Sequence, residues 1–94
     1  MKGSRYSRIT GGPESHYEKF NSTNAYVEHV FGHKVNTITI SNDSHTDDIQ
    51  VSFDGTTLKT DIYHDETITL YTHTHQSIYI KGTAGGGSVR LWGW

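Results

Sequence analysis

Histidine is the residue type in this chain with the clearest chemical potential, since seven occur among 94 residues. Their most specific spacing is His73-Thr74-His75. Residues two apart point to the same side of a β-strand, so both imidazoles would face one way. Two nitrogens make a weak metal site alone, although three chains around a threefold axis would bring more together. The ordinary alternative is a pair of solvated histidines at a loop. We therefore assign no metal site and no cofactor.

Carboxylates and glycines give no pattern of catalysis. A calcium site needs several oxygen ligands, but the acidic residues lack EF-hand-like spacing, which favours solvated acids at turns. A phosphate-binding loop requires a helix directly after its glycines. A strand is expected after Gly85-Gly86-Gly87 instead, so this stretch is expected to be a flexible connector. Neither a nucleophile elbow nor a buried acid pair is indicated. We predict that the protein is not an enzyme. The acids in question are Asp47, Asp48, Asp54, Asp61, Asp65 and Glu66.

Aromatic side chains outside the expected core are the remaining signal. On strand alternation, Tyr79, Trp92 and Trp94 face away from the aliphatic residues. Exposed tryptophan and tyrosine often mark a protein interface, and the same rings suit a platform on which a sugar stacks. A third interpretation is that the two tryptophans cap the open end of the sandwich or cover the first strand. We predict interface roles for Tyr6, Tyr17, Phe20, Tyr79, Trp92 and Trp94.

The elements that position these residues are predicted to be strands. Ile49, Val51 and Phe53 alternate with polar residues, and a second alternating run covers residues 58–62. Asp54-Gly55 between them predicts a β-hairpin, because a type I′ turn needs positive φ at both central residues.

Similar runs recur along the chain at intervals of roughly ten residues, with turn signals between them. We expect about seven strands, at residues 26–31, 34–42, 49–53, 58–62, 67–72, 77–81 and 89–94. This predicts an all-β fold, a single small antiparallel β-sandwich of Ig-like or jelly-roll-like type. Residues 25–94 would form the sandwich domain, and residues 1–24 an extended N-terminal arm. The predicted core is Val27, Ile38, Ile40, Ile49, Val51, Phe53, Leu58, Ile62, Ile68, Leu70, Ile78, Ile80, Val89 and Leu91.

Composition limits the classes of partner. The hydrophobic fraction is 32% and mean hydropathy is −0.64, which is lean for an independent core and favours assembly. Residues 25–94 carry eight carboxylates against four cations, which speaks against nucleic-acid binding. Cysteine is absent, and no apolar run is long enough to span a membrane. The N-terminal residues lack the apolar region of a signal peptide, so synthesis in the cytoplasm is expected.

From about Val35 to Trp94 the chain contains the runs TITISNDS, DIQVSFDG, ETITL and QSIYIKGTAGGGSVRLWGW. These runs resemble small β-sandwich virion structural proteins of tailed bacteriophages, in which an I-x-V-S-F-D-G run and an S-I-Y-I-K-G strand recur. The pattern consists of strands and turns, and no functional residue is carried over from it.

The resemblance implies a non-enzymatic virion structural protein that assembles in multiple copies, as a capsid decoration, neck or tail component. Its partners would be copies of itself and other virion proteins, with no nucleic acid and no membrane. One alternative is a carbohydrate- or receptor-binding module that stacks a surface glycan on Tyr79, Trp92 and Trp94. Another is a trimeric fibre or spike tip with a metal ion at His73 and His75. That spacing resembles the H-x-H device of phage fibre tips, although those chains usually sit in long intertwined shafts.

Overall fold

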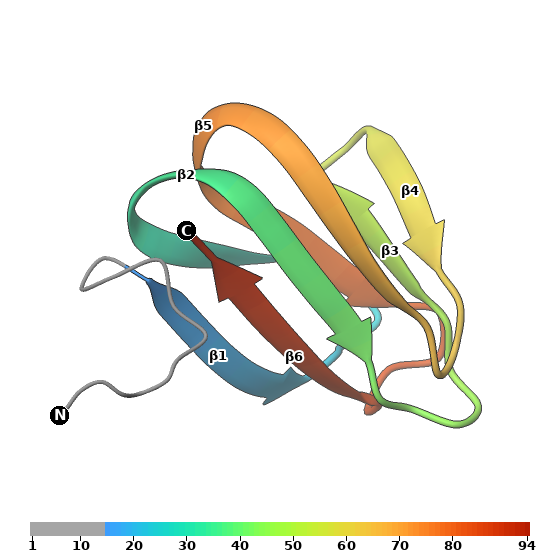
Figure 1. Cartoon of the computed structure of the whole chain (residues 1–94). Helices are drawn as coiled ribbons and strands as arrows, with labels where there is room; N and C mark the ends of the chain where they lie inside the picture. Colours follow the sequence, from blue (N-terminus) through green and yellow to red (C-terminus); the bar gives the residue numbers. More distant parts are fainter. Residues whose placement is uncertain (1–14) are drawn as a thin grey trace, which may run out of the picture.

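The computed structural model describes residues 15–94, apart from the side chains of residues 73 and 74, and the described part is all-β. Its strands form one antiparallel sheet with the order β1-β6-β2-β5-β3-β4. The predicted all-β antiparallel class is therefore confirmed. The strands are β1 (His16–Asn21), β2 (Val27–Asn42), β3 (Ile49–Ser52), β4 (Leu58–Ile62), β5 (Thr67–Gly82) and β6 (Ser88–Gly93) (Figure 1).

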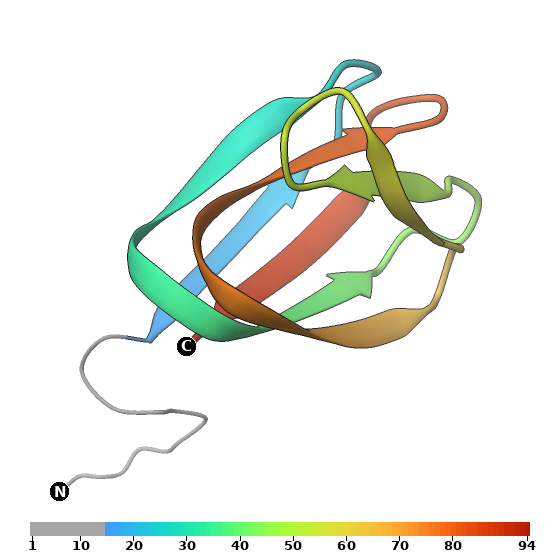
Figure 2. The ribbon, with the colours of Figure 1, turned by 90° about the horizontal axis from the view of Figure 1, so that it is seen from above.

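The sheet folds over on itself because β2 and β5 are long and bend together (Figure 2). Residues 27–30 of β2 pair with the second half of β5, whereas residues 37–41 pair with its first half. The register between the two strands shifts on either side of Val35, and Gly32 has a φ of 81°. Bulges of this kind increase local twist and bend a strand. One continuous sheet thereby supplies two facing layers.

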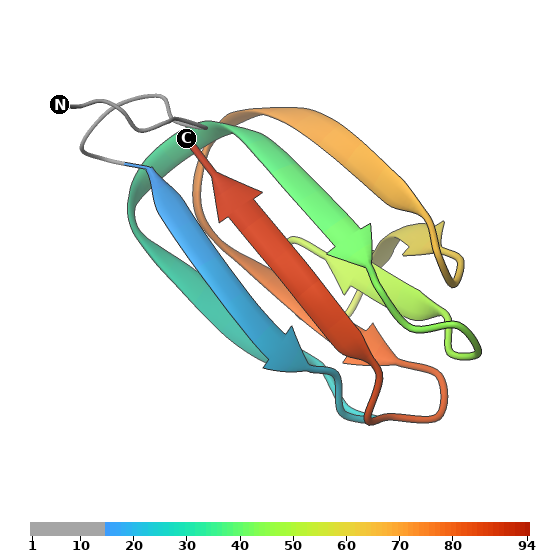
Figure 3. The ribbon, with the colours of Figure 1, turned by 60° about the horizontal axis from the view of Figure 1, so that its bottom comes forward.

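The first layer contains β1, β6, the second half of β2 and the first half of β5, in that order. Figure 3 shows β1, β6 and β2 side by side. The second layer contains the first half of β2, the second half of β5, β3 and β4. Each layer therefore has two outer edges.

The structure differs from the expected seven strands in two ways. The predicted strands at 26–31 and 34–42 are halves of β2, and those at 67–72 and 77–81 are halves of β5. In addition, residues 16–21, assigned to the arm, form β1, which pairs with β6 along its whole length. The alternation of side chains in HYEKFN covers only six residues and is flanked by polar residues, so it did not predict a strand. Residues 1–14 of the predicted arm lie outside the described residues.

The core fills the space between the layers and contains most of the predicted residues. Phe31 and Val35, which were not predicted, are also buried because they lie at the bend. Val27 and Leu58 were predicted wrongly, since they are 42% and 47% exposed. Val27 is the first residue of β2, in the part of that strand that pairs with β5 alone. Leu58 lies opposite Ser52, and not opposite an apolar residue, because the register between β3 and β4 shifts there. The predicted core residues that are buried are Ile38, Ile40, Ile49, Val51, Ile62, Ile78, Ile80, Val89 and Leu91; Phe53, Ile68 and Leu70 are partly buried against them.

The predicted hairpin of β3 and β4 is confirmed, but its type I′ turn is wrong. Gly55 has a φ of 85°, whereas Asp54 does not have a positive φ. Oδ1 of Asp54 instead accepts hydrogen bonds from the backbone N–H groups of Thr56 and Thr57, at 2.9 and 2.7 Å. These backbone bonds lower the pKa of Asp54. The loop is thus longer than a two-residue turn and is held by an aspartate side chain.

Candidate functional site

The outward side of the first layer gathers aromatic and hydroxyl side chains in rows that cross several strands. In one row, Tyr17 of β1 lies opposite Trp92 of β6, which lies opposite Thr39 of β2, which lies opposite Thr69 of β5. The next row is Lys19, Arg90, Ser41 and Thr67. Beyond the first row, Trp94 exchanges two backbone hydrogen bonds with Thr37, which pairs with Tyr71. We call this surface the aromatic outer face.

Trp92 lies at the centre of the aromatic outer face. Its ring is 5.3 Å from the ring of Tyr17, with an interplanar angle of 44°. The guanidinium carbon of Arg90 lies 5.2 Å from the Trp92 ring, which is a cation–π distance. Trp94 is 38% exposed at the end of the same strand. Three predicted interface residues, Tyr17, Trp92 and Trp94, therefore do lie on one face.

Arg90 is held in place by an ion pair and a chain of hydroxyls. Its Nε donates to Oδ2 of Asp43 at 2.7 Å, and its Nη2 donates to Oδ1 at 3.1 Å. Thr67 Oγ1 donates to Ser41 Oγ at 2.9 Å, and Ser41 Oγ donates to Asp43 Oδ1 at 2.8 Å. The hydrogen bonds from Arg90 lower the pKa of Asp43, and Asp43 in turn raises the pKa of Arg90. The polar groups are thus fixed before any ligand arrives.

A shallow hollow lies beside Trp92 on this face, with a volume of about 280 Å³. Arg90 and Trp92 come from β6, Trp94 directly follows it, and hydroxyls come from β2 and β5. The lining residues are Thr39, Ser41, Thr67, Arg90, Trp92 and Trp94. The hollow combines apolar rings with a few ordered polar groups, which is how small-ligand sites are built.

The first half of β5 is an open edge of the sheet. Residues 67–72 pair with β2 on one side, and no described strand pairs with them on the other. Their sequence, TITLYT, contains neither a charge nor a proline. Ile68 and Leu70 are only partly buried there, and Tyr71 is 83% exposed. We call this segment the open edge.

The inward side of β1 joins the two layers. Nδ1 of His29 donates to Oε2 of Glu18 at 2.8 Å, and Nε2 of His16 lies 3.2 Å from Oε1 of the same carboxylate. Burial raises the pKa of Glu18, but the hydrogen bonds from His29 and His16 outweigh that effect and leave it lowered. Phe20 stacks on His29 with ring centroids 3.9 Å apart. Phe20 therefore faces inward, away from the aromatic outer face.

The other predicted site residues lie apart from this face. Tyr79 belongs to the second layer, where its ring covers Gly55 and the carboxylate of Glu28 raises its pKa. Tyr6 lies outside the described residues. His73 lies in β5, and the ring of His75 stacks on Phe53 with centroids 4.2 Å apart. The structure thus does not unite Tyr79 with the tryptophans, and a metal ion at His73 and His75 stays an untested alternative.

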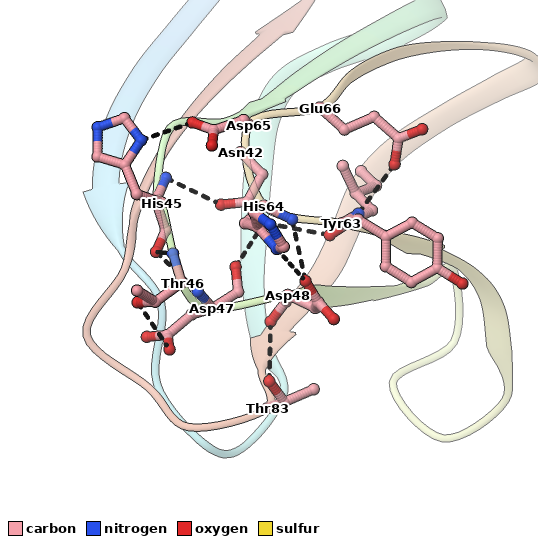
Figure 4. Close-up of polar contacts among 12 residues, drawn as sticks. Asn42, His45, Thr46, Asp47, Asp48, Tyr63, His64, Asp65, Glu66 and Thr83 are labelled. Atoms are coloured by element: carbon pink, nitrogen blue, oxygen red, sulfur yellow. Dashed lines mark hydrogen bonds and ion pairs between the residues drawn. The ribbon is translucent and has the colours of Figure 1, made fainter.

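The acidic turns form a hydrogen-bonded loop cluster at one end of the fold (Figure 4). Oδ1 of Asp48 accepts from the backbone N–H of His64 at 2.9 Å, and Glu66 accepts from the backbone N–H of Tyr63 at 2.9 Å. Nδ1 of His45 lies 2.7 Å from Oδ1 of Asp65. Within the described residues, no three acidic or histidine side chains are grouped to hold a metal ion. These acids therefore hold loops together.

The polar half of the aromatic outer face was not predicted from the sequence. On β6, Arg90 and Trp92 alternate with core residues, and the threonines at 67 and 69 do the same on β5. Their meeting with Ser41 depends on β6 pairing with β2 instead of with its chain neighbour β5. Alternation alone does not specify that strand order.

Comparison with known proteins finds likeness in structure but none in sequence. No protein-family profile matches the chain, and no curated protein sequence matches it. Among solved structures, it is similar to the crystal structure of the SPBc2 prophage-derived protein YomS. The identity is 15%, the match covers 94% of this chain and 96% of that chain, and the TM-score is 0.46. The described residues contain no helix of the length and apolar character needed to cross a bilayer.

Proposed function

We propose that this chain is a non-enzymatic bacteriophage virion structural protein whose copies assemble through the open edge at residues 67–72. The observation that carries the proposal is the uncharged, unpaired state of that edge. The resemblance of the strands at residues 35–94 to phage virion proteins supports the location in a virion.

An unpaired strand presents free N–H and C=O groups, which another chain can extend as a new strand. Natural edges are therefore blunted by charges, proline or bulges. The other edges of this sheet follow that rule: β1 carries Glu18 and Lys19, β4 carries Lys59 and Asp61, and the edge segment of β2 carries Glu28. The open edge carries none of these devices, which suits a strand that is covered in the assembly.

A second copy is the partner that matches this edge. Two antiparallel copies of TITLYT would pair without opposing charges, and each would cover the partly buried Ile68 and Leu70 of the other. Such a contact is isologous, because the same segment is used on both sides. It also adds apolar burial to a thin core.

Thr69→Lys tests the assembly. Thr69 is exposed in the middle of the open edge, and a lysine there would place like charges close together when two copies pair. Val30→Lys is the matched control, since Val30 is 58% exposed on an edge of the other layer. Molar mass by light scattering over a concentration series should show self-association of wild type and of Val30→Lys, but monomers of Thr69→Lys. A wild-type chain that stays monomeric at every concentration contradicts the proposal.

The virion location has its own test. Quantitative mass spectrometry of purified particles from the source phage should find the chain in several copies per particle. Its absence from particles would leave edge-to-edge assembly possible and would exclude the virion role.

A further inference from the structure

We propose that the hollow on the aromatic outer face binds a neutral carbohydrate. This goes beyond assembly, because edge-to-edge pairing at residues 67–72 adds a strand in the plane of the layer and leaves the outward face open. The residues that line the hollow supply the chemistry that such a ligand needs.

The apolar half of the site suits the C–H faces of a sugar ring. Trp92 and Trp94 are two residues apart at the end of β6 and both line the hollow. Tyr17, which does not line the hollow, packs against Trp92 with ring centroids 5.3 Å apart, so the indole is held without a ligand. Large rigid rings give contact area with little loss of side-chain entropy on binding.

The polar half suits sugar hydroxyls, which both donate and accept. Thr39 and Thr67 line the hollow, and their hydroxyl groups bond within the protein to Thr69 Oγ1 at 3.0 Å and to Ser41 Oγ at 2.9 Å. Each of the two hydroxyl oxygens keeps a lone pair that can accept a hydrogen bond. The bonds from Arg90 to Asp43 use Nε and Nη2, which leaves the two Nη1–H donors of the guanidinium outside this ion pair. Acceptors and donors thus lie beside the rings, as orientation of a polyhydroxylated ring requires.

The charge balance selects a neutral ligand. Arg90 is the cation that lines the hollow, and the bidentate pair with Asp43 neutralises it. Lys19 is its neighbour on β1, and the rest of the domain is acidic. A nucleic acid or a polyanionic glycan would need clustered free cations. A neutral sugar needs only the rings and the hydroxyls.

The site is also rigid. All six lining residues lie on paired strands or directly after one, and the chain of bonds from Thr67 through Ser41 to Asp43 orders the hydroxyls. A volume of about 280 Å³ is near the lower limit for small-ligand sites, which fits one sugar ring bound from solvent. Binding to single rings should be weak, so a polymer that presents many rings is the suitable probe.

Affinity electrophoresis in native gels that contain a soluble glucan, mannan or galactan tests the inference. At least one neutral polymer should retard the wild-type chain, and Trp92→Ala and Trp94→Ala should abolish the retardation. Thr67→Val, which keeps the shape but removes a hydroxyl, should weaken it several-fold. Tyr63→Ala is the matched control, because Tyr63 is 59% exposed in the loop after β4. Circular dichroism spectra and thermal melts confirm that each variant is folded.

Three outcomes overturn the inference. The first is that none of the three neutral polymers retards the wild-type chain. The second is that only the polyanion polygalacturonate retards it. The third is that folded Trp94→Ala binds a neutral polymer as well as wild type does. A chain that self-associates in light scattering but binds no neutral polymer contradicts this inference alone and leaves the proposed assembly in place.

Discussion

Glu18 on β1 and His29 on β2 are joined by a 2.8 Å hydrogen bond that connects the two layers of the sheet. His29 is almost fully buried, with 6% of its surface exposed, and Phe20 stacks on its ring. A residue of the expected arm therefore supplies the acceptor for a buried histidine. β1 is part of the domain because of its inward side chains as well as its ladder with β6.

Acidification should release this contact. The lowered pKa of Glu18 means that its carboxylate contributes stability at pH values above the ordinary value of 4.5, and that the contribution is lost as pH falls through the lowered folded value. Free energies of unfolding from urea titrations should therefore fall with pH more steeply for wild type than for Glu18→Gln. Asp61→Asn, on the exposed edge strand β4, should keep the wild-type slope. Equal slopes for wild type and Glu18→Gln would show that the carboxylate is not coupled to folding.

The sequence contained enough information for the strand segments after residue 25, but not for β1 or for the pairing of the strands. Alternation at Ile38 and Ile40, at Ile49 and Val51 and at residues 89–91 correctly predicted the core face of these three segments. It could not show that Phe31 and Val35 lie on one strand, because Gly32 between them resembles a turn signal. In the structure that glycine marks a bend within β2.

The candidate site could be predicted only in part, for a related reason. Trp92 and Trp94 were recognised by period-two alternation, which is a local property of β6. Tyr17, also predicted, joins them because β1 pairs with β6, and Asp43 reaches Arg90 across 47 positions of the chain. Such contacts depend on the strand order and on loop geometry, neither of which is encoded in a local pattern.

Two glycines should tolerate alanine poorly for different reasons. A Cβ at Gly93 would lie 2.8 Å from Cδ1 of Phe31 and 3.2 Å from Cγ1 of Val35, so Gly93→Ala overpacks the core by about 1–3 kcal/mol. A Cβ at Gly32 would meet nothing within 4 Å, but its φ of 81° is unfavourable for alanine by about 1 kcal/mol. Chemical denaturation gives both values.

Asparagine separates the two causes, because it tolerates positive φ better than alanine. Gly32→Asn should recover part of the stability that Gly32→Ala loses, whereas Gly93→Asn should be worse than Gly93→Ala. If Gly93→Ala unfolded at the wild-type urea concentration, close packing of Phe31 on this backbone would be refuted.

Asn42 is the buried polar residue most sensitive to replacement. It is 1% exposed, and its Nδ2 donates to the carbonyl oxygens of Asp47 and Ile62, at 2.8 and 3.1 Å (Figure 4). Asn42→Ala leaves both carbonyls without this donor and should destabilise the fold by roughly 2–4 kcal/mol, from the unpaired groups and the cavity. Asn42→Asp is nearly isosteric but replaces the donor with an oxygen that faces two carbonyl oxygens.

The two variants should differ in pH dependence, which separates lost packing from charge. Burial and the two carbonyls would raise the pKa of an aspartate at position 42 above its unfolded value. The ionised form is therefore disfavoured in the fold, so Asn42→Asp should be least stable near neutral pH and should gain stability relative to Asn42→Ala as pH falls. Urea unfolding of both variants between pH 4 and pH 8 measures this difference. A constant difference across that range would mean that the carboxylate reaches water, and that the loop cluster opens around it.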